Sequence, residues 1–252
     1  MIDRTELLQA FDTLLQPERF RDYGPNGLQV EGRATVGKIV SGVTASRALI
    51  EAAITAQADA IFVHHGLFWR GQDGTITGWM KQRLAVLLAH DINLVAYHLP
   101  LDAHPELGNN AQLGLKLGLQ AQSRFGEQEL GFLGEPQTGL AFATAQALCV
   151  HVAARLGRSV TLVEAAPRAI RKIAWCSGGA QGYFEAAIAA GADAFITGEI
   201  SEPQAHYARE CGVAFLACGH HASERYGAPA VAAQVAAQLG LAHEFIDIEN
   251  PA

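Results

Sequence analysis

The sequence predicts an α/β protein made of two related domains, and two observations support this. The first is an internal repeat: the segments EAAITAQADA (51–60) and EAAIAAGADA (185–194) match at eight of ten positions, 134 residues apart (185 − 51). The second is that each copy lies between apolar runs that are typical of buried strands. These runs are KIVSGVT (38–44) with AIFVHHG (60–66), and KIAWCSGG (172–179) with AFITGEI (194–200). Strand, helix and strand in this order indicate a parallel crossover unit, so an internal duplication would give two such domains.

A second correspondence strengthens the prediction of a duplication and bears on where the domains divide. The runs INLVAYH (92–98) and VAFLACGH (213–220) both end in a histidine, and His98 and His220 lie 122 residues apart (220 − 98). The same offset carries Asp102 to Glu224 (102 + 122). We place the domain boundary near residue 125, in a segment rich in glycine and proline, which gives domains 1–125 and 126–252. If the repeats are intertwined, this linear boundary is only approximate.

Composition and charge exclude several classes of protein. Half of the residues are hydrophobic and 17% are charged, which is typical of a globular chain with buried sheets. The net charge of −7 argues against a general nucleic-acid binder. The four cysteines show no C-x-x-C spacing, which disfavours a zinc knuckle. The first fifteen residues predict an amphipathic helix and not a secretory signal, and no apolar run is long enough to span a membrane, so we expect a cytoplasmic protein with no membrane partner.

Polar residues at the ends of the predicted strands indicate a metal site. Ligands of open α/β folds bind at the carboxyl ends of parallel strands. The candidate ligands there are His64, His65, His98, Asp102, His220, His221 and Glu224. Imidazole and carboxylate groups together suit zinc, iron, manganese or nickel. One carboxylate from each half predicts a pair of metals, and each of the two adjacent histidines could then bind its own ion.

The same residues also have less specific interpretations. A single histidine at a strand end is usually only a polar loop residue, and His98 could either ligate a metal or orient a ligand. The segment CSGGAQGY (176–183) could cradle an anion, but a tight turn between strand and helix is the better prediction because no lysine follows as in a P-loop. The serine hydrolase motif G-x-S-x-G is absent from the sequence.

Four segments together resemble a known family. FVHHGLFW, YHLPLDAHPELGNNAQL, GADAFITGE and GHHASER are similar to the dinuclear-metal-centre proteins known as GTP cyclohydrolase I type 2 homologues, and the similarity covers nearly the whole chain. The resemblance implies an intertwined pair of α/β/α domains, a toroidal homohexamer and two divalent metal ions per subunit. It places the metal ligands on His64, His65, Asp102, His220 and Glu224, with His98 and His104 beside the site.

Two classes of function follow from these observations. The first is a metal-dependent hydrolase that acts on a nucleotide or related small molecule through metal-activated water, with His98 or His104 as the catalytic proton carrier. The alternative is a non-catalytic hexameric scaffold or regulatory protein that metal stabilises. A metal-dependent redox enzyme is a third possibility. The substrate and the identity of the metal are not encoded in any motif that we recognise.

Overall fold

The computed structural model describes residues 1–165 and 167–252, and their contacts divide the chain into two compact units. Unit 1 contains residues 1–108 and 227–249, and unit 2 contains residues 109–226 and 250–252. Each unit therefore includes two separate stretches of the sequence. This grouping differs from the predicted linear boundary near residue 125, because the chain first passes from one unit to the other between Gly108 and Asn109.

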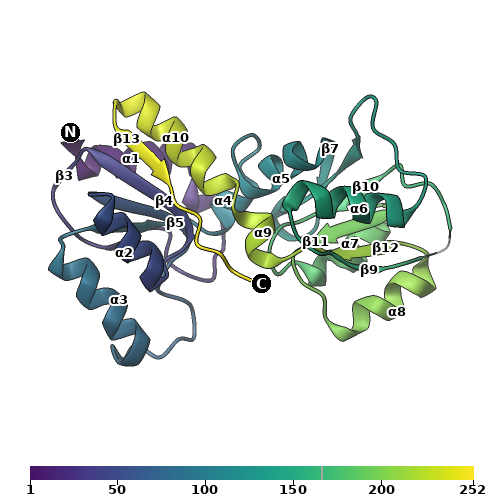
Figure 1. The fold of residues 1–252 in the computed structure, drawn as a ribbon, viewed down its shortest axis with the longest axis horizontal. Coiled ribbons are helices and arrows are strands. Elements are labelled where there is room, and N and C mark those ends of the chain that lie inside the picture. Colours follow the sequence, from purple (N-terminus) through teal and green to yellow (C-terminus); the bar gives the residue numbers. More distant parts are fainter. Residues whose placement is uncertain (166) are drawn as a thin grey trace. The chain divides into compact units, whose positions relative to one another are not determined.

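Unit 1 is an α/β domain built on a five-stranded sheet in the order β13-β4-β5-β6-β2 (Figure 1). Its first four strands run parallel, and β2 pairs with β6 in the antiparallel direction. Its elements are β1 (Ile2–Asp3), α1 (Arg4–Leu15), η1 (Pro17–Arg19), β2 (Gly27–Val30), β3 (Thr35–Val36), β4 (Lys38–Thr44), α2 (Arg47–Thr55), β5 (Ala60–His65), α3 (Gly78–Ala89), β6 (Asn93–Ala96), α4 (Leu99–Ala103), α10 (Gly227–Leu239) and β13 (Ala242–Phe245).

Helices cover both faces of this sheet because its central strands are apolar on both sides. In β5, Ile61 and Val63 pack with α2 and α3, whereas Phe62 packs on the other face with α1 and α10. Successive strand residues point to opposite faces, which explains the alternation. Burial on both faces is typical of parallel strands and accounts for the continuous apolar run that the sequence shows.

Unit 2 is an α/β domain built on a six-stranded sheet in the order β7-β8-β10-β11-β12-β9. The strands β10, β11 and β12 run parallel, and the outer strands are antiparallel to their neighbours. Its elements are α5 (Asn109–Leu117), β7 (Leu119–Phe125), η2 (Glu127–Glu129), β8 (Gly131–Pro136), α6 (Ala145–Leu156), β9 (Thr161–Val163), β10 (Ile173–Trp175), η3 (Gln181–Tyr183), α7 (Phe184–Ala189), β11 (Ala194–Thr197), α8 (Glu202–Cys211), β12 (Ala214–Ala217) and α9 (His220–Glu224).

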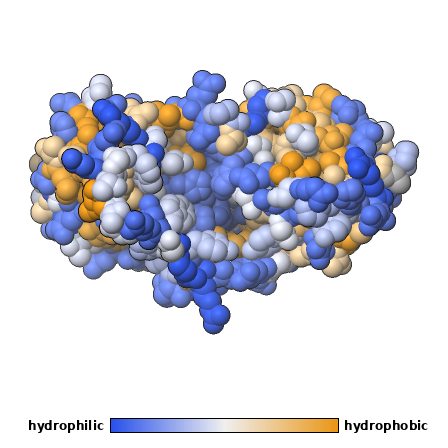
Figure 2. Space-filling view, turned by 90° about the horizontal axis from the view of Figure 1, so that it is seen from below, coloured by the Kyte–Doolittle hydropathy of each residue, from blue (hydrophilic) through white to orange (hydrophobic). Residues whose placement is uncertain are grey.

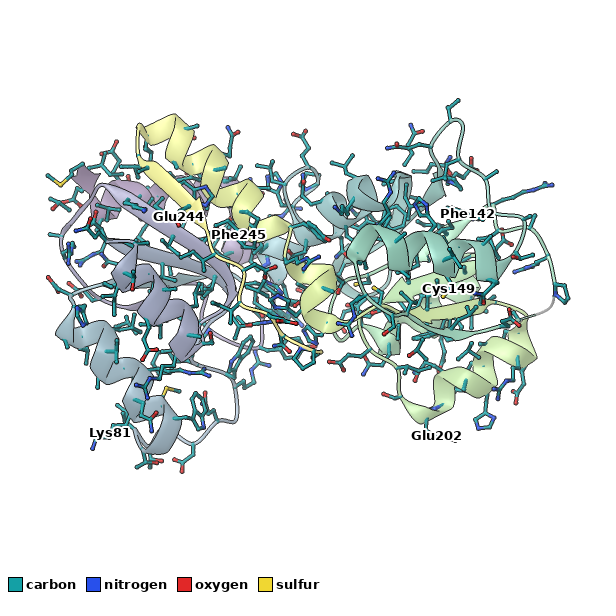
Figure 3. All side chains as sticks on the ribbon, viewed as in Figure 1. Lys81, Phe142, Cys149, Glu202, Glu244 and Phe245 are labelled. Carbon is teal, nitrogen blue, oxygen red and sulfur yellow. The ribbon has the colours of Figure 1, made fainter. Side chains whose placement is uncertain are left out.

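The core of unit 2 also lies on both faces of its sheet. On one face, Phe142 and Cys149 (Figure 3) belong to a cluster that includes residues of α5 and α6. On the other face, the ring of Phe184 stacks on Phe195 at 5.9 Å and meets Phe215 edge-on at 4.9 Å, measured between ring centroids. The α/β fold class that the sequence predicts is confirmed in both units. A duplication as its origin stays a prediction.

The repeated segment has the same structural role in each unit. Asp59 Oδ2 accepts hydrogen bonds from the backbone amides of Gly37 and Lys38, at 2.7 and 3.0 Å. Asp193 Oδ2 likewise accepts from the amides of Arg171 and Lys172, both at 2.9 Å. Each aspartate precedes one central strand and binds the segment that begins the neighbouring strand. The shared aspartate of the repeat is therefore explained by folding, and no catalytic role is needed to account for it.

Apolar side chains are exposed at scattered points on the surface. On the face shown in Figure 2, polar residues predominate and apolar residues are exposed in both units. Large exposed apolar side chains include Tyr23, Trp79, Leu88, Leu115 and Val150, a scatter that is normal for protein surfaces. Within residues 1–165 and 167–252, no helix has both the length and the hydropathy that crossing a membrane requires.

The repeat also predicts a difference in stability between its two copies. Both helices end in the same hydrogen-bonding motif: Ala58 donates to Ala53 and Gln57 to Ile54 in unit 1, as Ala192 donates to Ala187 and Gly191 to Ile188 in unit 2. The residue in the left-handed conformation is Gln57 in one copy (φ 58°) and Gly191 in the other (φ 80°). Glycine adopts this conformation without the steric penalty that other residues incur.

We expect Gln57→Gly to stabilise the protein by about 1 kcal/mol, because it removes that penalty. The matched change Gly191→Gln should destabilise it by a similar amount. Each shift corresponds to roughly 2–4 °C in the melting temperature, measured by thermal denaturation. A lower melting temperature for Gln57→Gly would contradict the explanation.

Candidate metal centre

Two adjacent histidines end strand β5 in unit 1. His64 is fully buried, and its Nδ1 lies 3.2 Å from the backbone oxygen of Tyr97. Because a carbonyl only accepts hydrogen bonds, Nδ1 carries the hydrogen in the neutral ring and Nε2 carries the lone pair that a metal needs. The ring of His65 lies 4.4 Å from that of His64, and its Nδ1 is 3.1 Å from Thr44 Oγ1 on strand β4. Both rings are thus held through Nδ1.

His98 precedes helix α4 and is held at two points by residues 22–26. Its Nδ1 lies 2.7 Å from Asp22 Oδ1, and its backbone N–H donates to Asn26 Oδ1 at 2.8 Å. Asp22 Oδ2 also accepts from Leu99 N and from Asn26 Nδ2, both at 2.9 Å. Burial raises the pKa of the Asp22 carboxyl, but its hydrogen bonds and the nearby charge of His98 outweigh this, and the net pKa is lowered. Asp22 is therefore an anion at neutral pH.

The three imidazoles converge. His64, His65 and His98 each offer a ring nitrogen, and these nitrogens all lie within 4.8 Å of one another. They meet because β5 and β6 are parallel neighbours whose carboxyl ends fall at the same edge of the sheet. The sequence-based expectation that strand-end residues cluster in this half of the chain is met for these three histidines.

Helix α4 adds a carboxylate to this cluster. Asp102 is buried, and its Oδ1 lies 3.5 Å from His64 Nε2. His104 ends the same helix, but its Nδ1 accepts the backbone N–H groups of Glu106 and Leu107, at 3.3 and 3.0 Å. That nitrogen stabilises the turn after α4. The predicted proton-carrier role of His104 stays a prediction.

In unit 2, a histidine and a glutamate face each other along helix α9. His220 Nε2 lies 3.1 Å from Glu224 Oε2, because residues four apart lie on the same face of a helix. His220 Nδ1 lies 2.6 Å from Glu199 Oε1, just after strand β11. Burial lowers the pKa of His220, but hydrogen bonds and charges from Glu224 and Glu199 outweigh this effect and raise its pKa to about 9. The imidazole thus lies between two carboxylates.

Close backbone packing at the strand ends positions these groups. A Cβ atom at Gly178 would overlap the Glu224 carboxylate, and one at Gly198 would lie 2.7 Å from the Cα of His220. Ser223 Oγ accepts from Gly178 N at 2.9 Å and donates to the His220 carbonyl at 2.8 Å. The glycine-rich segment after β10 therefore supports the Glu224 side chain, which agrees with its prediction as a turn.

The side chains of both units fit a divalent metal. Metal-binding histidines usually donate their second ring nitrogen to a carbonyl, carboxylate or water, as His64 and His220 do here. Asp102 and Glu224 are 8% and 3% exposed, and a buried carboxylate is costly unless a cation or hydrogen bonds compensate it. The donor set of imidazoles and carboxylates suits borderline ions such as zinc or iron.

Sequence reasoning missed the residues that orient the histidines. Asp22 and Asn26 lie in a turn-rich loop far from His98 in sequence, and no motif marks them. Glu199 lies inside the predicted run 194–200 and two residues beyond the end of β11 at Thr197, so the strand-end rule could have identified it. His221, a candidate ligand by position alone, donates its backbone N–H to the Ala252 carbonyl at 3.2 Å.

Comparison with known proteins gives matches along the whole chain. A family model described as Duf34/NIF3 (NGG1p interacting factor 3) matches residues 2–251. A protein of Neisseria meningitidis serogroup A is 51% identical over 252 residues, with full coverage of both chains. A protein of Pseudomonas aeruginosa is 50% identical, covering 98% of this chain and 97% of its own. Both relatives are named GTP cyclohydrolase 1 type 2 homolog.

Solved structures agree with this fold. A structure described as protein ybgI, of unknown function, shares 46% identity and a TM-score of 0.95, with full coverage of both chains. TTHA1606 from Thermus thermophilus shares 32% identity and a TM-score of 0.88, again with full coverage of both chains.

The charge on Glu199, beside His220, predicts that the stability of the metal-free protein depends on pH. The folded pKa of His220 is about 9, above its ordinary value of 6.5. The protonated imidazole therefore stabilises the fold fully below about pH 6.5, and this contribution disappears as the pH rises through 9. In Glu199→Gln we expect the His220 pKa to fall toward its ordinary value, because one of its two anionic partners is lost.

NMR titration of the His220 ring and urea unfolding between about pH 6 and 10 would measure both effects. Glu202→Gln is the matched control, since Glu202 is an exposed carboxylate on α8 beside His206 (Figure 3). An unchanged His220 titration in Glu199→Gln would contradict the assignment.

Proposed function

Because this chain belongs to the Duf34/NIF3 family, we propose that it binds two divalent metal ions and hydrolyses a nucleotide or related small molecule. The observation that carries the proposal is the pair of ligand clusters, in which imidazoles held through Nδ1 lie beside buried carboxylates. The cyclohydrolase name of the curated relatives supports the class of substrate. The assembly into a homohexamer stays a prediction.

We assign the metal ligands as His64, His65 and Asp102 from unit 1 and His220 and Glu224 from unit 2. Bound divalent ions would lower the pKa of water and stabilise the charge that develops during hydrolysis. The chain's own residues then have defined tasks. Asp102 and Glu224 supply one carboxylate from each unit. The Tyr97 carbonyl keeps the hydrogen of His64 on Nδ1, and Glu199 does the same for His220.

The assigned carboxylate ligands have a measurable consequence for metal content. We expect about two ions per wild-type chain after reconstitution, and Asp102→Asn and Glu224→Gln should each lower the affinity for metal. The physical reason is that each change replaces an anionic ligand with a neutral amide. Elemental analysis and calorimetry measure the stoichiometry and affinity, and Glu202→Gln is the control that should retain both ions. Wild-type metal content and affinity in both variants would contradict the assignment.

Hydrolysis is tested with the reconstituted protein and a panel of nucleotides that includes GTP. We expect turnover that depends on added zinc, iron, manganese or nickel. Mass spectrometry of the products measures it. Glu224→Gln should reduce turnover by more than the roughly 10–100-fold typical of residues that only orient a ligand. If the metal-loaded protein turns over no nucleotide, the hydrolase proposal fails and a metal-stabilised scaffold becomes the better hypothesis.

A further inference from the structure

We propose that Tyr23 and Trp69 form an aromatic platform on which the heterocyclic base of a nucleotide stacks, and that Arg70 binds the phosphate of the same ligand. The inference rests on the proposed action on a nucleotide and deepens it, because it names the residues that would hold the substrate. None of the three is among the assigned metal ligands. All three belong to unit 1, on the loops that precede β2 and follow β5.

Both rings of the platform border the histidines of unit 1. The ring of Trp69 lies 5.0 Å from that of His98, nearly perpendicular to it, and 6.0 Å from that of His65, measured between centroids. The ring of Tyr23 lies 6.0 Å from that of His98, with an angle of 67° between the ring planes. A planar group that stacks on either ring would therefore lie beside the candidate metal centre, where the reacting part of a substrate has to be.

More than half of Tyr23 is open to solvent, although its ring borders polar groups. Tyr23 is 58% exposed and Trp69 is half-buried. Trp79 on α3 is similarly exposed, but the guanidinium of Arg83 lies over its ring at 4.7 Å. Proteins that bind single-stranded nucleic acids stack bases on aromatic side chains, and this contact suits any base because every base has a π-face. The accessible ring of Tyr23 thus favours a ligand that carries such a base.

Close packing between the two loops holds the platform in place. Arg70 N donates to the Tyr23 carbonyl at 2.6 Å. A Cβ atom at Gly24 would overlap the carbonyl oxygen of Phe68 and would lie 3.5 Å from Cε3 of Trp69, so only glycine allows the loops to approach this closely. A surface that is already ordered loses little conformational entropy when a ligand binds. The two rings are therefore arranged before the ligand arrives.

Arg70 supplies a positive charge next to the platform. Its side chain is exposed, and its Nη2 donates to the Asp22 carbonyl at 2.7 Å, which fixes the guanidinium beside the loop that carries Tyr23. A guanidinium has five N–H donors and can bind phosphate oxygens in pairs. In a chain with a net charge of −7, an arginine held beside two aromatic rings favours a ligand with both a base and a phosphate.

Binding of GMP and ribose 5-phosphate to the metal-reconstituted protein tests the platform, because the two ligands differ only in the base on the ribose. We expect GMP to bind at least about tenfold more tightly. Tyr23→Ala should weaken GMP binding by about 5- to 150-fold, which corresponds to the loss of one stacked base, and should leave the affinity for ribose 5-phosphate unchanged. Tyr23→Phe keeps the ring and should bind GMP as the wild type does. Isothermal titration calorimetry measures these affinities.

Two further variants separate the base from the phosphate. Trp69→Leu keeps apolar volume but removes the indole, so it should weaken GMP binding and not ribose 5-phosphate binding. Arg70→Gln should weaken both ligands, because each carries a phosphate. The matched control is Trp79→Ala, an exposed aromatic residue of the same unit, which should bind GMP with wild-type affinity. Melting curves and metal content identify any variant that fails to fold or to retain metal.

The outcome distinguishes the platform from the proposed hydrolase. Wild-type GMP affinity in Tyr23→Ala, or a wild-type protein that does not prefer GMP to ribose 5-phosphate, would overturn the platform. Either result leaves the hydrolase proposal intact if nucleotides are still turned over. GMP binding that depends on Tyr23, in a protein that hydrolyses no nucleotide, would support the platform and contradict the hydrolase.

Discussion

The burial of carboxylates is the constraint on which the rest of the site depends. Asp102, Glu224 and the side chain of Asp22 are almost completely removed from solvent. An isolated buried charge is too costly for a folded protein, so each must have a cation or several hydrogen-bond donors within reach. The structure supplies donors to Asp22 and the raised-pKa imidazole of His220 to Glu224. A cation held beside the lone pair of His64 Nε2 would compensate Asp102.

The two units meet this constraint in similar ways but with different residues. His98 and His220 occupy matching positions in the repeat, and each has a carboxylate on Nδ1 at 2.6–2.7 Å. The acid behind His98 is Asp22, from a loop before the sheet. The acid behind His220 is Glu199, from the end of a neighbouring strand. Since the orienting acids come from parts of the chain that do not correspond, the similarity between the two pairs reflects their chemistry and not the repeated sequence.

The sequence predicted those features that depend on local patterns. The runs 38–44 and 60–66 correspond to β4 and β5 because buried parallel strands are continuously apolar. Asp22, Asn26 and the grouping of residues 227–249 with unit 1 were not predicted. They depend on contacts between segments far apart in the chain, and a single sequence contains no signal for such contacts.

In each unit, the residues that stabilise the fold and the residues of the candidate site lie at opposite ends of the central strands. Asp59 and Asp193 bind the backbone amides that begin the neighbouring strand, and their contacts are the same in both units. They lie at the amino ends of β5 and β11, whereas the histidines and acids of the site lie at or beyond the carboxyl ends of the strands. The amino ends of these strands thus contribute to folding, whereas the carboxyl ends carry the candidate site. A residue shared by the two halves is evidence for chemistry only when it lies at the carboxyl end, because the amino end is already explained by the pairing of the strands.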